Sequence, residues 1–463
     1  MKTIKSTWKE KIFYAFGNMG SYVLWSFLGA FVNIYATDCI DPGSDLIAVL
    51  GDIILACRIF DAFSDILMGI IIEKTNSKVG KARLWFGISI IPLLIVFFFL
   101  FYVSGFDKIA AIVMISVLYF LFTVVFYTMN CIGFNAMLPR ISNDSYDQSI
   151  ICTVNSVFTS IGGLVCAIGV PVLTFFGGKS NQNAWTIFIL ILIAAAFVGE
   201  LLCFIFVKEK PEIVVADKRP SRSDLRKGLH ALFHTKYFYI AIALFTINFY
   251  ISLSVIGIGD YYAIWVLRDE KWFSIFGSVP MVTMAVGLLL TPLFIKLFGK
   301  RIVLVGATAC VALGNIIGSC FPFSWVAGLI AVLVKGFGSA VVMSQLFSLA
   351  PDLVAYIEAK IGLRVEGLAA SANSFGQKIG SGLGTAASLW AIALCGYKAK
   401  AATQTDQVIY TFITFYWWIP TVLSLVLVLL ASFWNIESKT KALVAAKGLS
   451  VPLSQQKEQG SIK

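Results

Sequence analysis

Residues 47–73 read IAVLGDIILACRIFDAFSDILMGIIIE, an apolar run that carries Arg58, Asp61 and Asp65 in its central part, besides Asp52 and Glu73 nearer its ends. A helix needs about 20 apolar residues to cross the hydrocarbon core of a membrane, because each backbone amide must be satisfied within its own segment. This run is long enough, and it predicts one membrane-spanning helix. By the same test, further spans are predicted at 12–38, 84–106, 109–138, 150–177, 184–207, 236–266, 273–298, 301–321, 324–350, 366–396 and 408–435.

The composition agrees with a membrane protein. Hydrophobic residues make up 59% of the 463 positions and charged residues 13%, whereas soluble domains are roughly 45–50% apolar and about 25% charged. The net charge of +11 comes from basic residues spread over short loops, which argues against nucleic-acid binding. The nine cysteines show no CxxC spacing, so we expect neither a metal cluster nor a disulfide framework.

The loops predict the orientation of the chain. Met1 to Lys11 is basic but continues directly into a full-length span, so no cleavable signal peptide is expected. An even number of spans places both termini on one side, and most of the 36 Lys and Arg residues lie in loops on that side. Positive charge marks the cytoplasmic face. We therefore predict a multi-pass protein of the cell (inner) membrane, in contact with the lipid bilayer and monomeric, with cytoplasmic termini.

The chain divides into two similar halves. Its longest polar stretch follows six predicted spans, and short motifs recur in the two halves: GKAR at 80–83 with GKR at 299–301, and LPR at 138–140 with APD at 350–352. Two parallel six-helix repeats are typical of the major facilitator fold, an all-α membrane architecture of twelve transmembrane helices whose binding site lies between the halves. The predicted units are an N-terminal bundle (1–207), a cytoplasmic central loop (208–235), a C-terminal bundle (236–440) and a cytoplasmic tail (441–463).

The acids in the second span indicate a cation site. A charged side chain at bilayer depth costs at least about 2.5–3.5 kcal/mol, so those that are retained usually have a function. Asp61 and Asp65 are four residues apart, share one helical face and repel each other unless a cation or proton lies between them. Ser64 and Thr128 could add hydroxyl oxygens for a monovalent cation such as Na+. The alternative is a structural salt bridge of Arg58 with either acid.

Other charged residues fall within or near spans. Lys378, in the small-residue segment Gly376-Gln377-Lys378-Ile379-Gly380, is expected to pair with Asp61 or Asp65 across the two halves. Lys335 and Asp260 could pair with each other, line a cavity or lie near a helix end, and Glu200 has no evident partner. His230 and His234 fall outside the spans, so a histidine proton relay is not expected.

Two long motifs resemble one transporter family. The stretch RIFDAFSDILMG at 58–69, with Thr75 and GKAR at 80–83, follows the pattern R-x-x-D-A-x-x-D-P-x-x-G…G-K/R-x-R, with Ile66 in place of the proline. The stretch DLVAYIEAKIGLRVEG at 352–367 resembles the loop between helices 10 and 11 of the same family, and Lys378 follows where that family keeps a lysine. The chain thus resembles the glycoside-pentoside-hexuronide cation symporters, the group that includes melibiose permease.

This resemblance implies a function and a set of residues. Asp61 and Asp65 would bind the coupling ion, Na+ or H+, together with Ser64 and Thr128, and no other cofactor would be needed. Ser64 stands where sodium-using members often have asparagine, which leaves the choice of ion open. Arg58 and Lys378 would couple the charges of the two halves. Contacts that form and break at the cytoplasmic side are expected from Gly80, Lys81, Arg83, Asp352 and Arg364.

The expected sugar site departs from the melibiose-type pattern. Tyr22 replaces an acidic residue, Cys131 an aspartate, Asn135 a tryptophan and Asn155 an arginine. An aspartate that accepts from sugar hydroxyls and a stacking tryptophan are how such pockets hold a galactoside, so a melibiose-like substrate is not expected. The substrate is predicted to be another glycoside, a pentoside or a hexuronide, with wall residues Tyr22, Trp25, Asn130, Cys131, Asn135, Asn155 and Tyr262.

Other functions stay open at this point. Each aromatic residue named as a wall residue could instead belong to the helix-packing core. Because the sugar-binding residues are altered, the alternatives are a cation-coupled carrier of a non-sugar amphiphile and a sensor that binds without transport. An enzyme is not predicted, since no P-loop, HExxH or GxSxG motif occurs in a fitting context.

Overall fold

The computed structural model describes residues 5–75, 77–142, 145–210, 230–361, 366–398, 401 and 403–446, and its regular elements are all helices. The first group of elements is α1 (Trp8–Ile34), η1 (Tyr35–Ile40), α2 (Ser44–Lys74), α3 (Lys81–Leu100), α4 (Lys108–Phe120), η2 (Leu121–Tyr127), α5 (Thr128–Ile141), α6 (Ser145–Ala167), α7 (Gly169–Phe175) and α8 (Gln182–Phe206). The second group is α10 (Lys236–Trp265), α11 (Lys271–Phe298), α12 (Lys300–Cys320), α13 (Trp325–Ile361), α14 (Glu366–Leu394), α15 (Asp406–Ile413), η3 (Thr414–Trp418), α16 (Ile419–Ser432) and α17 (Ile436–Ala446).

These helices cover the predicted spans, with four differences. Helix α3 ends at Leu100, where the prediction continued to residue 106. Helix α13 continues through Pro351 to Ile361, where the prediction ended at the proline; buried Leu353 and Ile357 hold the extra turns against the core. The fifth span breaks near Ile168, between α6 and α7. The predicted tail begins in a helix, α17, whose first residue Ile436 is buried.

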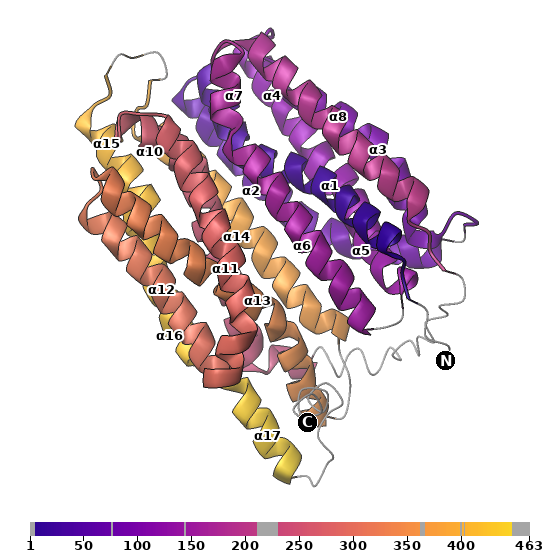
Figure 1. Ribbon diagram of the computed structural model, residues 1–463. Helices are drawn as coiled ribbons and strands as arrows, with labels where there is room; N and C mark the ends of the chain where they lie inside the picture. The colour runs from indigo at the N-terminus through magenta and orange to yellow at the C-terminus, as the bar shows by residue number, and fades with distance from the viewer. Residues whose placement is uncertain are drawn as a thin grey trace.

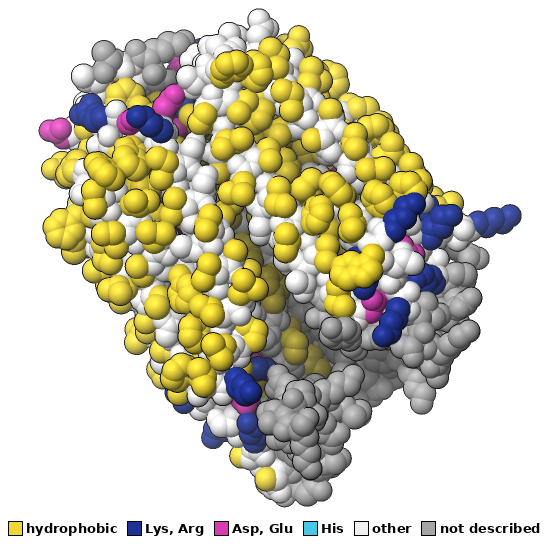
Figure 2. Space-filling model, in the orientation of Figure 1, with side chains coloured by type: hydrophobic (Ala, Val, Ile, Leu, Met, Phe, Trp, Pro, Cys, Tyr) yellow, Lys and Arg dark blue, Asp and Glu magenta, His cyan; other side chains and the backbone are white. Residues whose placement is uncertain are grey.

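The first and second groups of helices form two bundles that lie side by side (Figure 1), and α1 begins at the end of the molecule where α17 lies. Between the bundles, α2 packs against α14, α6 against α11, and α1 against α10. Apolar side chains cover the middle of the surface and charged side chains gather toward its two ends (Figure 2). The same view shows a furrow between the two bundles.

Ten of the described helical segments are long and apolar enough to cross a membrane, and α2 and α14 are not among them. These are the helices that carry Asp61, Asp65 and Lys378. Glycines bring α14 close to α10: a Cβ at Gly380 would lie 2.3 Å from the carbonyl oxygen of Thr246 and one at Gly384 2.6 Å from that of Tyr250. Small residues of this kind allow close helix packing in lipid, and here they fix the position of Lys378.

At the end of the molecule where the termini lie, a buried ion pair joins two helices of the first bundle. Lys11 Nζ lies 2.5 Å from Asp147 Oδ1, and Ser6 donates through its backbone N–H and its hydroxyl to Asp147 Oδ2. Burial alone would raise the pKa of Asp147, but the hydrogen bonds from Lys11 and Ser6 outweigh it and hold that pKa well below its usual range. The pair therefore ties α1 to the start of α6.

We expect Asp147→Asn to destabilise the protein at neutral pH by about 1–3 kcal/mol, the value of hydrogen bonds to a charged group. A lowered pKa stabilises the fold above the unfolded value of about 3.9, and this contribution is lost as the pH falls toward the folded value. The gap in Tm between wild type and variant should thus narrow below about pH 4. Thermal unfolding in detergent, followed by intrinsic fluorescence across pH, measures it.

The control is Asp406→Asn, at an exposed position in the first turn of α15, which should stay within about 0.5 kcal/mol of wild type. A gap that is constant from neutral to acid pH would contradict the ionic role of Asp147.

Candidate functional site

The two acids of α2 hold the lysine of α14 between them. Lys378 Nζ lies 2.9 Å from Asp61 Oδ1 and 2.6 Å from Asp65 Oδ2, and it also donates to the backbone oxygen of Asp61 at 2.7 Å. The Asp61 side chain is 2% exposed and that of Asp65 18%. The lysine thus contacts both acids, where the sequence predicted one of them, and it joins the two bundles near the middle of their helices.

Hydroxyl groups surround the acid pair. Thr128 donates to Asp61 Oδ1 at 2.8 Å, Ser64 donates to the backbone oxygen of Asp61 at 2.9 Å, and the two hydroxyl oxygens lie 3.2 Å apart. Ser374 of α14, which the sequence reasoning did not name, lies 3.4 Å from Asp65 Oδ2. Two carboxylates and neutral oxygens suit a hard monovalent cation. Within the described residues no group of three or more His, Cys, Asp or Glu could hold a metal ion.

Arg58 does not form the salt bridge with Asp61 or Asp65 that the sequence analysis gave as the alternative to a cation site. Its guanidinium lies over the ring of Trp25 at 4.0 Å and near that of Tyr119 at 5.6 Å. Among the described residues, Arg58 itself forms no ion pair with Asp61 or Asp65. Its side chain is buried, and Nε and Nη1 have no hydrogen-bond partner. Aromatic faces attract a cation, and Lys378 already occupies the carboxylates, so the arginine is drawn to the rings.

A π-helical segment shapes the site. Helix η2 ends at Tyr127, which stacks on Trp25 at 4.4 Å, and the next residue, Thr128, reaches Asp61. Tyr127, Trp25 and Arg58 thus form three stacked layers beside the acid pair. Such π segments are frequent at functional sites, and the apolar run Leu121–Phe126 gives no sequence signal for one.

The predicted wall residues fall into two sets. Asn130 is fully buried and accepts from Ser21, and Asn135 is exposed and donates to Cys131 Sγ at 3.4 Å. Tyr22 and Asn155 are half-buried on α1 and α6. Tyr262 lies apart from them, stacked on Tyr416 at 4.2 Å, with its hydroxyl donating to the backbone oxygen of Pro322. It is 1% exposed, so its side chain packs within the second bundle.

Two acids without an assigned role have partners. Ser21 Oγ lies 2.8 Å from Glu200 Oε1, which gives Glu200 the partner that the sequence did not reveal. Asp260 pairs at 2.6 Å with Lys179 of the α7–α8 loop and not with Lys335. In the described part of the chain Lys335 has no ion-pair partner, and its stem packs against Gly314.

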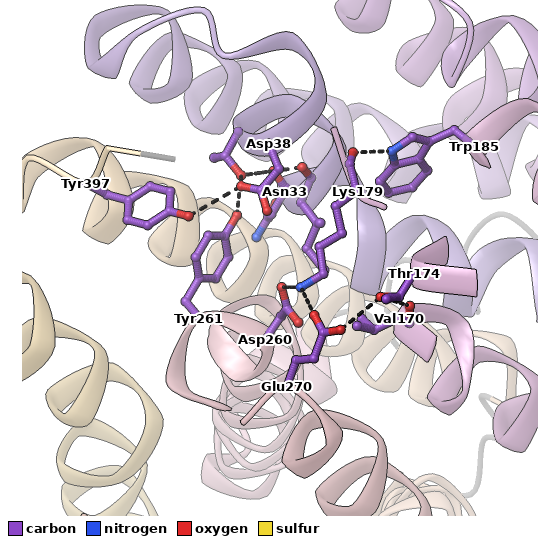
Figure 3. A network of polar contacts seen from close by, with 12 residues as sticks. Asn33, Asp38, Val170, Thr174, Lys179, Trp185, Asp260, Tyr261, Glu270 and Tyr397 are labelled. Atoms are coloured by element: carbon purple, nitrogen blue, oxygen red, sulfur yellow. Dashed lines mark hydrogen bonds and ion pairs between the residues drawn. The ribbon is translucent and has the colours of Figure 1, made fainter. Parts of the chain in front are cut away.

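At the end opposite the termini, polar contacts close the two bundles together (Figure 3). Lys179 Nζ also lies 3.5 Å from Glu270 Oε2, and Thr174 donates to Glu270 Oε1 at 2.9 Å. Thr37 and Tyr261 hydroxyls are 2.5 Å apart. Burial alone would lower the pKa of Lys179, but the neighbouring carboxylates, above all Asp260, raise it. Lys179 is therefore charged and bridges the first bundle to the second.

At the end of the termini, the predicted gating residues contact their own bundle. Glu209 accepts from the backbone N–H groups of Lys81, Ala82 and Arg83 at 3.1, 2.8 and 2.7 Å, a cap on the start of α3. Gly80 has φ +120°, and a Cβ there would lie 2.8 Å from Glu209.

In the second bundle, Asp352 pairs with Lys300 at 3.3 Å. Arg364 lies outside the described residues.

We expect Lys179→Gln to shift the protein toward a form that is open at this end, because Asp260 loses its buried counter-charge. If the free-energy difference between the closed and open forms changes by about 1–3 kcal/mol, the ratio of open to closed protein rises about 5- to 150-fold. Spin labels at Ser180 and Thr405, in a background without native cysteines, report it as a longer distance in the variant.

The matched control is Lys271→Gln, since Lys271 is 73% exposed and pairs with Asp269 of its own bundle. Equal distance distributions in Lys179→Gln and wild type would show that Lys179 does not hold this end closed.

Comparison with known proteins agrees with this arrangement. The family model described as MFS/sugar transport protein matches residues 13–438. The isoprimeverose transporter of Lactiplantibacillus pentosus is 25% identical over 94% of this chain and 91% of its own length. The glucuronide carrier protein homolog of Escherichia coli is 25% identical over 87% of each chain.

The solved structures agree as well. The crystal structure of a D-xylose-proton symporter superimposes with a TM-score of 0.67 and 12% identity, over 92% of this chain and 97% of the other. This likeness shows the major facilitator fold. The chain is thus a multi-pass membrane protein that belongs to the MFS/sugar transport protein family, within the glycoside-pentoside-hexuronide group that its motifs indicate.

Proposed function

We propose that the protein transports a sugar or glycoside and couples its uptake to the inward movement of a monovalent cation, Na+ or H+, by alternating access. The observation that carries the proposal is the contact of Lys378 with both acids of α2. A tethered ammonium there occupies the position that a free cation would take. Relatives named for isoprimeverose and glucuronide support a glycoside, pentoside or hexuronide as substrate.

The coupling follows from competition for the acids. A cation that enters between Asp61 and Asp65 neutralises part of the charge that holds Lys378, so the contact between α2 and α14 weakens. Substrate binding at the interface between the bundles then depends on cation occupancy, and by linkage the cation binds better when substrate is present. In this proposal the bundles 1–207 and 236–440 move against each other about that site.

The orientation is part of the proposal. The basic loops support a cytoplasmic location for the end of the molecule where the termini lie, together with the central loop 208–235 and the tail 441–463. The contacts around Lys179 then lie on the outer side and are formed in this conformation. Opening the outer side would require Lys179 to leave Asp260 and Glu270. We propose a monomer in the lipid bilayer as the working unit.

Asp65→Asn tests the function directly. In proteoliposomes, uptake of glycosides, pentosides and hexuronides is first screened with Na+ and pH varied independently, and lysolipids are added as competitors to test a non-sugar amphiphile. With the substrate found, the variant should lose cation-stimulated uptake by at least about 100-fold, because one of two charged ligands is gone, as for a loss of about 2.7 kcal/mol. Expression should be unchanged.

The control is Asp45→Asn, an exposed acid in the first turn of the same helix, which should transport as wild type does. Cation-dependent uptake that survives in Asp65→Asn would refute the proposed site. Binding of substrate without counterflow in the wild type would instead indicate a sensor.

Lys378→Gln tests the competition. Because the variant has no tethered charge between the acids, Na+ should bind at least about tenfold more tightly, equivalent to about 1.4 kcal/mol, while coupling to substrate is lost. Sodium binding to the purified protein and sodium-driven uptake measure the two effects.

The control Lys398→Gln changes an exposed lysine beyond the end of α14, and it should leave both sodium binding and sodium-driven uptake unchanged. Weaker Na+ binding in Lys378→Gln would mean that the lysine supports the cation site and does not compete for it.

A further inference from the structure

A second buried acid lies in the first bundle, away from the contact with Lys378. Glu200 of α8 is 0% exposed, and so is Asn130 of α5; Ser21 of α1, between them, is 4% exposed. Ser21 Oγ lies 2.8 Å from Glu200 Oε1 and 2.7 Å from Asn130 Oδ1. Glu200 Oε2 and Asn130 Nδ2 have no hydrogen-bond partner. Three helices therefore meet at one polar cluster with unused hydrogen-bonding capacity.

With the Asn130 amide oriented as placed, the hydrogen bonds of this cluster need one more proton than an ionised glutamate provides. Ser21 has a single hydroxyl proton, yet its oxygen lies within bonding distance of three acceptors: the Asn130 carbonyl at 2.7 Å, the Glu200 carboxylate at 2.8 Å and, farther away, the backbone oxygen of Gly17 at 3.4 Å. A protonated Glu200 resolves the conflict: its O–H donates to Ser21, and Ser21 donates to Asn130. Rotating the Asn130 amide by 180° also satisfies the bonds, but it leaves a buried negative charge.

The surrounding groups decide between these two arrangements. Among the described residues no Lys or Arg pairs with Glu200. Arg83 of α3 donates instead to the backbone oxygen of Phe204 at 2.9 Å, and Tyr14 of α1 donates to that of Phe134 at 3.3 Å. The thiols nearby, Cys131 on α5 and Cys203 on α8, supply no positive charge. A buried carboxylate without a counter-charge is strongly disfavoured, so the protonated arrangement is the one that fits.

The cluster is connected to the cation site through the short segment of α5 from Thr128 to Asn130. Thr128 donates to Asp61, and two residues later Asn130 accepts from Ser21. Both follow directly after the π-helical η2. A change at Asp61 that moves Thr128 therefore also moves Asn130 and alters the hydrogen bonds around Glu200.

We propose that Glu200 is a second proton-binding site of this protein, holding its proton in the conformation seen here and responding to occupancy of the site formed by Asp61 and Asp65. The linkage rests on the proposed cation coupling, whereas the proton on Glu200 does not. The proton remains on the carboxyl while Ser21 and Asn130 keep their positions. It becomes exchangeable when the turn from Thr128 to Asn130 shifts.

Infrared spectroscopy of the full-length protein in proteoliposomes tests the proposal, because a protonated carboxylic acid has a carbonyl band separate from that of a carboxylate. At neutral pH we expect the wild type to show a band that is lost in Glu200→Gln. In Ser21→Ala the band should persist but shift to higher frequency, since the acid loses its acceptor. Adding Na+ to the wild type should shift the band, and Asp65→Asn should abolish that shift while keeping the band.

The control Glu437→Gln changes an acid that is 39% exposed on α17 and should leave the band intact. If Glu200→Gln does not fold, Glu200→Asp and Ser21→Ala still report the band by its displacement. Identical spectra for the wild type and all Glu200 and Ser21 variants would overturn the proton assignment. A wild-type band that does not respond to the coupling cation found in the uptake screen would overturn the linkage, and persisting cation-stimulated uptake in Asp65→Asn would separately refute the proposed function.

Discussion

The structure depends on how three charges are balanced inside a membrane. Asp61 and Asp65 lie one turn apart on α2, and in a medium of low dielectric constant they repel each other strongly. Lys378 of the opposite bundle relieves this repulsion through contacts of 2.9 and 2.6 Å. The same contacts join the two bundles. A change in the charge between the acids therefore becomes a change in the force that holds the halves together, which is what a coupled carrier requires.

Much of this architecture could be predicted from the sequence. Apolar length gave the spans, and the acids stood out because charge is costly in lipid. The pairing of Lys378 was predictable for the same reason, since a buried ammonium needs a counter-ion. The choice of α2 and α14 is physically connected to this. These two helices fall short as apolar spans because they carry the charges and the small residues, and their packing on each other covers those charges.

The features that could not be predicted depend on three-dimensional contacts that produce no periodic pattern in the amino-acid sequence. The position of Arg58 over Trp25 depends on whether Arg58 or Lys378 pairs with Asp61 and Asp65. The sequence shows that both cations are present, but it does not show which of them forms the ion pairs. Glu200 seemed to have no partner because its partner, Ser21, is a neutral residue 179 positions away. Lys179 and Asp260 meet only because a loop of one bundle reaches the other. The stacking of Tyr262, a predicted wall residue, on Tyr416 also left no sequence signal, because an aromatic residue near a helix end serves packing as readily as binding.

The two contacts that join the bundles differ in what can replace them. Lys179 at one end is paired with Asp260 and Glu270 of the second bundle, and in the proposed mechanism that contact forms or breaks as a whole. The site of Lys378 has two acids, hydroxyl oxygens from Ser64 and Thr128, and a side chain that is 15% exposed. A small cation can therefore take over part of the lysine's role there. In the proposed mechanism the ion acts at the middle of the molecule, where substitution is feasible, and the outer contact reports the result as an opening or closing of the far end.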